Sequence, residues 1–345
     1  MIRIVADRAI PFLEGVFDPH YGTLIQKDGR EITREDLLDA DVLITRTRTR
    51  CDASLLEGTR VQMIATATIG TDHIDLPWCS AHGIDVASAP GCNAGGVMDY
   101  VFSALYGIAS RKGLNLGGRT IGVVGVGHVG GRVTAMARQL GFEVLCCDPP
   151  RAEAEGPDGF CSLEYLLEHA GIVTLHIPLN EQTRGMADAD FFARLQPGTI
   201  FINASRGEVV DEAALLEALP RLGAVVIDTW CNEPAVNREL LDRVDIATPH
   251  IAGYSYQGKQ NGTAAAVRAV ARHFGFEELY SFFPPLLGPE DEAIRLEVAG
   301  KTQGEIAALF QYNYPIFTDD FMFRVNPEGF ERLRAEYRYR REYYI

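Results

Sequence analysis

The sequence predicts an α/β protein with two doubly wound, parallel-sheet domains. Short apolar segments alternate with helical patterns over most of the chain, and a glycine-rich turn near the middle starts a second series of the same kind. Such alternation is typical of parallel sheets covered on both faces. The 345 residues suffice for two or three domains, and the hydrophobic share of 47% is ordinary for a globular protein.

The first series runs from residue 1 to about residue 90. Its expected strands lie in IRIVAD, DLLDADVLITR, VQMIATATIG and GIDVASAP. MIRIVAD alternates apolar and charged residues as an edge strand does, and it does not resemble a signal peptide. No apolar run reaches the roughly 18 residues of a membrane-spanning helix, so we expect a cytoplasmic protein.

A long helix is expected next, in NAGGVMDYVFSALYGIASRKG. Its apolar positions 97, 101, 105 and 108 recur at helical spacing, and Gly113 follows as a stop. The second series has strands in RTIGVVG, EVLCCD, IVTLHIPL, TIFINAS, AVVIDTW and DIATPHI. After about residue 280 the chain continues with the proline-rich connection SFFPPLLGPED and a short tail that is aromatic and rich in arginine and glutamate.

Charge and cysteine content exclude several kinds of partner. The 32 basic and 47 acidic residues give a net charge of −15, which disfavours nucleic acid and anionic membranes but not a small anionic substrate. The seven cysteines form no C-x-x-C pair, and Cys146 and Cys147 lie within an expected strand. We therefore expect reduced thiols, with neither a disulfide framework nor a metal site.

A dinucleotide-binding turn is predicted by Gly125, Gly127 and Gly130, which form G-x-G-x-x-G. The pattern alone is common, but here it follows the strand TIGVV and precedes the helical run GRVTAMARQLG. The first glycine permits a tight turn, the second lets a pyrophosphate approach, and the third lets helix and strand pack. Amides around His128 and Val129 would face the phosphates of a cofactor in a Rossmann-like domain.

Asp148 ends the next expected strand, 18 residues after Gly130. A carboxylate there accepts hydrogen bonds from the adenosine ribose and repels a 2′-phosphate, so the sequence favours NAD over NADP. Arg151 weakens this preference, because a nearby arginine can accommodate that phosphate. The alternative is an α/β domain whose glycine turn is merely structural.

Three charged residues follow strands of the second series: Arg206 after TIFINAS, Glu233 after AVVIDTW, and His250 after DIATP. Ligands of such sheets bind at the carboxyl ends of the strands, so the three are expected to converge. A histidine can take the hydroxyl proton during hydride transfer, a carboxylate can orient that histidine, and an arginine can grip a substrate carboxylate. Each residue also has a structural explanation, as a turn histidine, a turn acid and a cation that neutralises neighbouring acids.

These residues lie in motifs that resemble those of the D-2-hydroxyacid dehydrogenase family: G-V-G-x-V-G, N-x-S-R-G-x-V-V-D, D-x-W-x-x-E-P and T-P-H-I-A-G. A narrower likeness is to a branch that acts on a phosphorylated 2-hydroxy acid. It rests on T-A-T-I-G-T-D-H-I-D, A-P-G-C-N-A, C-D-P-P-R-A, H-I-A-G-Y and G-F-E-R-L-R-A-E-Y-R-Y-R-R-E. The resemblance covers essentially the whole chain.

The resemblance implies NAD-dependent oxidation of a small phosphorylated 2-hydroxy acid, with His250 as proton acceptor and Arg206 and Glu233 in the active site. Ile177 stands where relatives carry threonine, so a contact there would come from its backbone. The implied cofactor contacts are Asp148, Ile177, Ala204, Ser205, Asp228 and Gly253, and the implied substrate contacts are Thr47, Thr68 and Tyr254.

The resemblance also implies a domain plan. Residues 1–93 and 255–280 would form the substrate domain, and residues 94–254 the NAD-binding domain. Residues 281–345 would form a small C-terminal α+β domain through which two copies make a homodimer.

Arg46, Arg48 and Arg50 follow the strand ADVLI, with Thr47 between the first two. In an extended chain the three cations would share one side and could bind a substrate phosphate, and Arg46 is the candidate we name. In a turn they would diverge. The alternative is a solvated basic loop.

Two other functions share these motifs. Another D-2-hydroxyacid dehydrogenase, of 3-phosphoglycerate, glycerate or lactate type, has the same active-site residues, although the tail lacks the βαββαβ pattern of many phosphoglycerate enzymes. An NAD(H)-sensing interaction protein on the same scaffold would keep them too. A formate dehydrogenase-like enzyme is disfavoured, because those relatives place glutamine at the position of Glu233.

Overall fold

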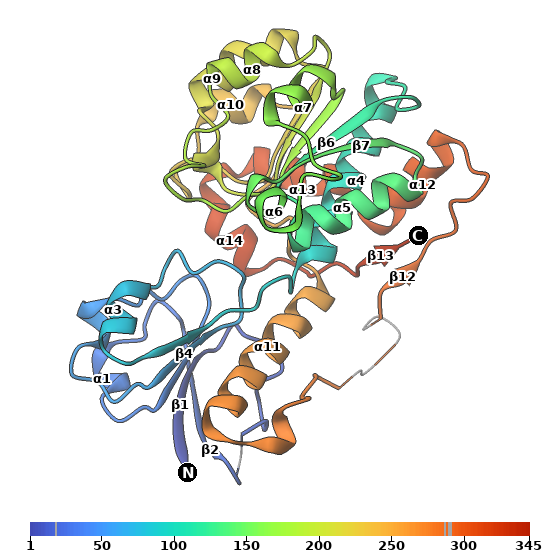
Figure 1. Ribbon diagram of the computed structural model, residues 1–345. Helices are drawn as coiled ribbons and strands as arrows, with labels where there is room; N and C mark the ends of the chain where they lie inside the picture. Colours follow the sequence, from blue (N-terminus) through green and yellow to red (C-terminus); the bar gives the residue numbers. More distant parts are fainter. Residues whose placement is uncertain (18, 286–287, 289–291) are drawn as a thin grey trace. The chain divides into compact units, whose positions relative to one another are not determined.

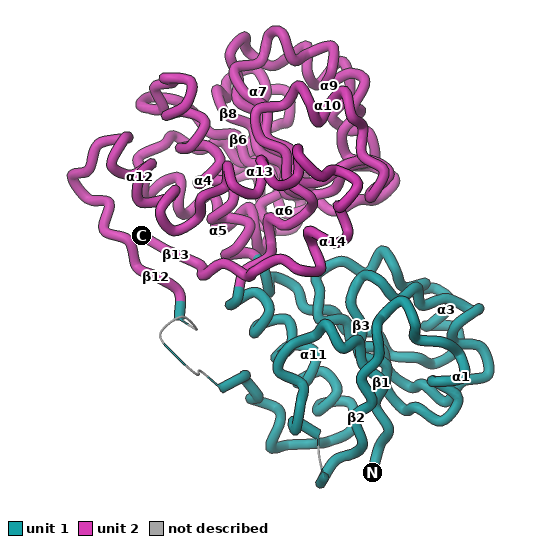
Figure 2. Tube along the Cα trace, turned by 180° about the vertical axis from the view of Figure 1, so that it is seen from behind, with its two compact units in different colours: residues 1–93, 256–292 teal, residues 94–255, 293–345 magenta. Residues whose placement is uncertain are grey.

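The computed structural model describes residues 1–17, 19–285, 288 and 292–345 (Figure 1). The chain divides into two compact units, which Figure 2 colours separately. One unit comprises residues 1–93 and 256–292, and the other comprises residues 94–255 and 293–345. Each unit is built around its own parallel sheet, so the predicted doubly wound α/β class is confirmed.

The sheet of the first unit has the strand order β2-β1-β3-β4-β5, and all its pairings are parallel. The predicted edge position of the first strand is wrong, since β1 lies between two neighbours. Its alternating pattern arises because the strand begins at the surface, while Ile4 and the three residues after it are buried. The strands are β1 (Ile2–Asp7), β2 (Gly22–Lys27), β3 (Val42–Thr45), β4 (Met63–Thr66) and β5 (Asp85–Ala87).

Helices cover both faces of this sheet. On one face Leu37, Leu56 and Cys79 are buried against the strands, and on the other Val267 and Val270 are. The first three belong to α1 (Arg34–Leu37), α2 (Ala53–Leu56) and α3 (Leu76–Ala81), and the last two to α11 (Tyr256–Phe274). The chain thus returns from the second unit to complete the core of the first.

The sheet of the second unit has the order β11-β10-β9-β8-β6-β7 and is also parallel throughout. The chain builds it outward in both directions from β6, so the order reverses between β6 and β8. Ligands bind beside such a reversal, beyond the carboxyl ends of the strands. The strands are β6 (Thr120–Val124), β7 (Glu143–Cys147), β8 (Ile172–Leu175), β9 (Ile200–Asn203), β10 (Ala224–Ile227) and β11 (Ile246–Ala247).

The predicted long helix is α4 (Ala94–Lys112), and it ends at Gly113, which has a φ of 66°. This left-handed conformation suits glycine and stops a helix. Together with α5 (His128–Gln139) and α12 (Gln303–Asn313), α4 packs on one face of the sheet. The opposite face carries α7 (Leu163–His169), α8 (Ala189–Arg194), α9 (Glu212–Ala218) and α10 (Arg238–Arg243).

The tail from residue 293 belongs to the second unit, so a separate C-terminal domain at 281–345 is not confirmed. The predicted connection SFFPPLLGPED lies partly outside the described residues. Phe310, Phe323 and Phe330 of the tail are fully buried in the cores of this unit. The remaining elements of the tail are α13 (Ile316–Val325), α14 (Phe330–Ala335), and the paired strands β12 (Ile294–Arg295) and β13 (Tyr343–Tyr344).

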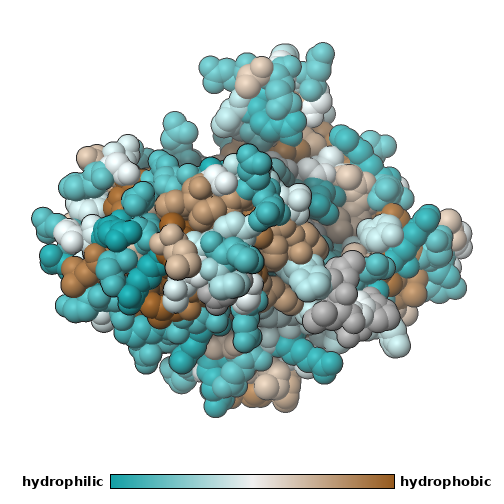
Figure 3. All heavy atoms as spheres, turned by 90° about the horizontal axis from the view of Figure 1, so that it is seen from below, coloured by the Kyte–Doolittle hydropathy of each residue, from teal (hydrophilic) through white to brown (hydrophobic). Residues whose placement is uncertain are grey.

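On the face shown in Figure 3, hydrophilic residues surround smaller apolar patches. None of the helices in the described part of the chain is long and apolar enough to cross a bilayer. All seven cysteines are free thiols, and the described residues contain no group of acidic, histidine or cysteine side chains arranged to hold a metal ion.

Candidate active site

The glycine turn joins β6 to α5 and can be built only with glycine at two of its positions. Gly125 has a φ of 83°, and a Cβ atom there would lie 2.5 Å from the carbonyl oxygen of His176. A Cβ on Gly130 would lie 1.9 Å from the carbonyl oxygen of Gly125. At Gly127, by contrast, a Cβ would meet nothing within 4 Å. The packing of the protein does not explain the glycine at 127, and the open space beside it suits a pyrophosphate at the start of α5.

Asp148 ties this turn to the end of β7. Its Oδ2 accepts the amide of Val126 at 2.7 Å, and its Oδ1 accepts the amide of Arg151 at 3.1 Å, at the start of α6 (Pro149–Glu155). Each carboxylate oxygen has two lone pairs, so the group can still accept a ribose hydroxyl. Arg151 donates to both carboxylate oxygens of Glu155 and to the carbonyl of Val126. Because that guanidinium is already engaged, the site fits NAD better than NADP.

Three other predicted cofactor residues follow β8 and β9. The Cγ2 atom of Ile177 would lie 2.7 Å from a Cβ on Gly125, so this side chain packs against the turn. Ser205 is fixed by Asn203, whose Oδ1 accepts its amide at 3.1 Å and its hydroxyl at 2.8 Å. Ala204 lies between these two residues and is partly exposed. All three therefore lie at the carboxyl edge of the sheet, and their contacts with the cofactor stay predictions.

His250 and Glu233 form a direct pair at the ends of β11 and β10. Nδ1 of His250 lies 2.8 Å from Oε2 of Glu233, and Oε1 of Glu233 accepts the amide of Trp230 at 2.9 Å. The side chains are 30% and 21% exposed, so the pair is sheltered but reachable. Burial acts to raise the pKa of Glu233, but the His250 charge and hydrogen bond and the Trp230 amide outweigh it, and the pKa is lowered. An ionised Glu233 accepts from Nδ1–H, which leaves Nε2 of His250 to take a proton.

Asp228 holds the loop that carries His250. This carboxylate is 1% exposed and accepts the Thr248 hydroxyl at 2.6 Å. It also accepts the amides of Ile251 at 2.8 Å and Ala252 at 2.9 Å. Burial raises its pKa, although His250 and these hydrogen bonds oppose the shift. A contact between Asp228 and the cofactor would therefore come in addition to its structural role.

Arg340 holds the same loop from the other side, and the sequence analysis missed it. Nη1 donates to the carbonyls of Ile251 at 3.0 Å and Tyr254 at 3.2 Å. Nη2 donates to the carbonyls of Ala252 and, at 2.8 Å, of Gly96. The guanidinium is buried and lies 4.1 Å from the ring centroid of Tyr314. Residues 250–254 form what we call the histidine loop. Asp228 thus binds amides of this loop, and Arg340 binds its carbonyls.

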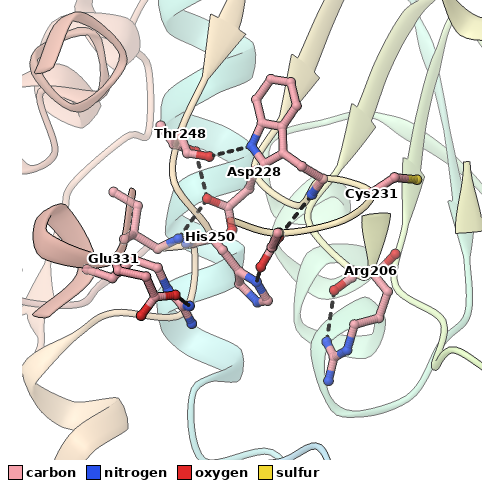
Figure 4. Close-up of polar contacts among 12 residues, drawn as sticks. Arg206, Asp228, Cys231, Thr248, His250 and Glu331 are labelled. Carbon is pink, nitrogen blue, oxygen red and sulfur yellow. Dashed lines mark hydrogen bonds and ion pairs between the residues drawn. The ribbon is translucent and has the colours of Figure 1, made fainter. Parts of the chain in front are cut away.

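Arg206 follows β9 on a turn packed against the segment after β10. A Cβ on Gly207 would lie 2.0 Å from the carbonyl carbon of Trp230, so only glycine lets the two turns approach. The carbonyl oxygen of Arg206 accepts a hydrogen bond from Nδ2 of Asn203 at 3.0 Å. Nη1 of the Arg206 guanidinium donates to the carbonyl of Ser205 at 2.8 Å. Figure 4 shows Arg206 on one side of His250 and Glu331 on the other.

The predicted substrate residues of the first unit differ in how exposed they are and in what they contact. Thr68 shares a 2.7 Å hydrogen bond with Thr66, whereas Thr47 is exposed at the tip of a turn. Because of that turn, the extended arrangement of the three arginines is wrong. Arg46 is buried and donates to the carbonyl of Ala9 at 3.4 Å, while Arg50 points outward to Asp52.

Two predicted residues belong to the loop after His250. Gly253 is partly exposed, and its carbonyl carbon would lie 3.4 Å from a Cβ on Gly96. The ring of Tyr254 lies 5.9 Å from the guanidinium of Arg334. Both residues are in the second unit with His250.

The family described as "D-isomer specific 2-hydroxyacid dehydrogenase, NAD binding domain" matches residues 105–252. An erythronate-4-phosphate dehydrogenase of Ectopseudomonas mendocina is 43% identical over 99% of this chain and 93% of its own. One from Bacteroides fragilis is 42% identical, over 99% of this chain and 97% of its own. Among solved structures, the NAD+-bound 3-phosphoglycerate dehydrogenase of Entamoeba histolytica has a TM-score of 0.66 at 26% identity, over 80% of this chain and 96% of its own.

Proposed function

Because the chain belongs to the erythronate-4-phosphate dehydrogenases, within the D-isomer specific 2-hydroxyacid dehydrogenase family, we propose that it oxidises 4-phospho-D-erythronate with NAD. The product would be (R)-3-hydroxy-2-oxo-4-phosphooxybutanoate. The structural observation that carries this proposal is the pair of Glu233 and His250, which follows strands of the same parallel sheet as a glycine turn suited to a dinucleotide.

NAD, when bound, supplies the acceptor for the hydride that leaves carbon 2 of the substrate. His250 takes the proton of the 2-hydroxyl at Nε2, and the carboxylate of Glu233 stabilises the imidazolium that results. Arg206 holds the substrate carboxylate in a two-point contact, which keeps carbon 2 directed at the acceptor. The bonds of Asp228 and Arg340 to the loop keep His250 in place during this transfer.

The cofactor would be held by the turn from Gly125 to Gly130, with Asp148 on the adenosine ribose. Thr47, Thr68, Tyr254 and Arg46 are the proposed substrate contacts. The other proposed cofactor contacts are His128, Val129, Ile177, Ala204, Ser205, Asp228 and Gly253.

We place this reaction in the cytoplasm and in the formation of pyridoxal 5′-phosphate. Seven cysteines without a disulfide are usual for a reducing compartment and support the first assignment. The substrate named for the relatives supports the second.

We also propose that the enzyme is a homodimer formed through its C-terminal region. Large apolar side chains are exposed on α12 and α13, which is unusual unless another surface covers them. Their exposed fractions are 88% for Tyr312, 62% for Phe321, 46% for Met322 and 59% for Val325. If the proposal is right, Phe321→Glu yields a monomer in light scattering, whereas a monomeric wild-type protein would refute it.

The reaction itself is tested by identifying the product. Purified protein is incubated with NAD and 4-phospho-D-erythronate, and the 2-oxo acid is trapped as a hydrazone for mass spectrometry. Formation of the phosphorylated 2-oxo acid together with NADH supports the proposal. Turnover restricted to 3-phosphoglycerate, glycerate or lactate would assign another enzyme of the family, and no turnover with any of them would favour a sensing role.

A further inference from the structure

Arg334, on α14, is a largely buried cation whose guanidinium is only partly hydrogen-bonded. Its side chain is only 13% exposed. Its ion pair joins Nη1 to Oε1 of Glu331 at 3.3 Å, and its Nε has no hydrogen-bond partner among the described residues. Burying a guanidinium without full pairing is unfavourable, so such a site gains free energy when an anion enters it.

The surroundings of Arg334 keep it charged. Its guanidinium lies 5.5 Å from the ring centroid of Phe330 and 5.9 Å from that of Tyr254, and both contacts favour a cation. Burial acts to lower the pKa of Arg334, but Tyr254 and the carboxylates of Glu233 and Glu331 outweigh it and raise the pKa. The charge of Arg334 therefore interacts with that of Glu233, the carboxylate that pairs with His250.

The positions of the cations match the two ends of the proposed substrate. Carbon 2 of 4-phospho-D-erythronate lies between a carboxylate at carbon 1 and a phosphate at carbon 4. In Figure 4, Arg206 and Glu331 flank His250 on opposite sides, and Arg334 is the ion-pair partner of Glu331. With the carboxylate on Arg206 and the 2-hydroxyl at His250, we infer that the phosphate end extends to the side of Glu331 and its partner Arg334.

We propose that Arg334 binds the phosphate of the substrate, a role that rests on the proposed function. The contact with Glu331 does not prevent this, because the ion pair engages Nη1 at 3.3 Å and a guanidinium has further donors. A phosphate presents several acceptor oxygens to the guanidinium, which favours a contact with more than one of them. Arg334 would thus select the phosphorylated hydroxy acid over its unphosphorylated analogue.

The test compares Arg334→Met and Arg334→Lys with the wild type on two substrates, 4-phospho-D-erythronate and D-erythronate. Arg332→Met is the matched control, since Arg332 lies on the same helix but is exposed. We expect Arg334→Met to lower kcat/KM for the phosphorylated substrate by about 100-fold and for D-erythronate by less than about threefold. Arg334→Lys should retain part of the preference, and Arg332→Met should keep all of it.

An equal loss on both substrates in Arg334→Met, with unchanged NADH affinity and melting temperature, would overturn the proposal and assign Arg334 to the support of Glu233. If Arg334→Met does not fold, the same comparison is made with Arg334→Lys. Should the wild type fail to oxidise 4-phospho-D-erythronate, the proposed function fails first. Binding of inorganic phosphate by calorimetry then tests Arg334 separately: about tenfold weaker binding to the variant supports the site, and equal binding refutes it.

Discussion

Nδ1 of His250 lies 2.8 Å from Oε2 of Glu233, while the other oxygen of that carboxylate accepts the amide of Trp230. The amide of Trp230 therefore fixes the carboxylate that orients the imidazole. The lowered pKa of Glu233 keeps it ionised, so it accepts from Nδ1–H and leaves Nε2 of His250 able to take a proton. The most consequential feature of the site is thus a histidine whose tautomer is set by the protein, as the base that we propose requires.

Glu233→Gln should lower kcat by about 100-fold or more, because a neutral amide cannot stabilise the imidazolium that forms during oxidation. KM for NAD should stay within about threefold of the wild type, since Glu233 is not among the proposed cofactor contacts. Steady-state kinetics with both substrates varied will show this. A kcat within threefold of the wild type would remove Glu233 from the mechanism.

Gly127→Ala and Gly130→Ala should separate cofactor binding from folding. The methyl at 127 meets nothing in the protein, so the free energy of unfolding should hardly change while the dissociation constant for NADH rises at least about tenfold. The methyl at 130 would clash with the carbonyl of Gly125, so that variant should lose stability by several kcal/mol. Urea denaturation and fluorescence titration with NADH measure the two effects. Unchanged NADH affinity in Gly127→Ala would contradict our placement of the pyrophosphate.

Glu155→Ala should weaken discrimination against NADP. Arg151 now donates to both oxygens of Glu155, and the substitution would free that guanidinium for a 2′-phosphate. We expect kcat/KM for NADP to rise about three- to tenfold while kcat/KM for NAD is unchanged. Glu153→Ala, on the same helix, is the control. A ratio unaffected by the Glu155 substitution would show that Arg151 has no part in cofactor choice.

Asp99→Asn should make the protein more stable at neutral pH than the wild type. Asp99 is fully buried, its Oδ2 accepts the amide of Tyr343 at 3.0 Å, and its Oδ1 has no partner in the described part of the chain. Burial, followed by the nearby charge of Glu342, raises its pKa well above the usual value. The folded state therefore holds a proton that the unfolded state releases above about pH 4.

Consequently, the contribution of Asp99 to stability is fully present below that pH and is lost as the pH rises toward the folded-state pKa. The stability advantage of Asp99→Asn should grow by up to about 1.4 kcal/mol for each pH unit over that range. Urea unfolding of both proteins at several pH values between 4 and 8 provides the measurement. Parallel curves for the two proteins would contradict the assigned shift.

Arg340→Met should destabilise the second unit by roughly 3 kcal/mol or more, because the loop that carries His250 and the carbonyl of Gly96 would lose the buried guanidinium that binds them. The fraction that stays folded should also have a lower kcat, since His250 would no longer be held in place. Arg338→Met is the matched control, because Arg338 lies two residues earlier and is exposed. Equal stability of the Arg340 and Arg338 variants would refute the role of Arg340.

Much of the fold and part of the site could be predicted because their signals are local. The strand, glycine turn and helix around Gly125 are contiguous, and Gly113 stops α4 as its spacing indicated. His250 and Glu233 were predicted to meet because both follow parallel strands, whose carboxyl ends share one edge of the sheet. Their separation in sequence did not matter once the strands were recognised.

The parts that escaped prediction depend on contacts between distant or irregular segments. Arg340 binds carbonyls almost 90 residues earlier in the chain, and the tail that carries it has no periodic pattern. The central place of β1 was missed because a six-residue alternation does not distinguish an edge strand from one that starts at the surface. Arg46 and Arg50 diverge because the chain turns between them, which their spacing alone left open.

We propose that the protein is a phosphate-selective dehydrogenase in which His250 is the base. The most direct measurement is the rate of NADH formation by the wild type and by His250→Ala on 4-phospho-D-erythronate, D-erythronate and D-3-phosphoglycerate under identical conditions. We predict a preference of at least about 100-fold in kcat/KM for the first substrate, and its loss in the variant. Faster turnover of D-3-phosphoglycerate, or an unchanged rate in His250→Ala, would contradict the account.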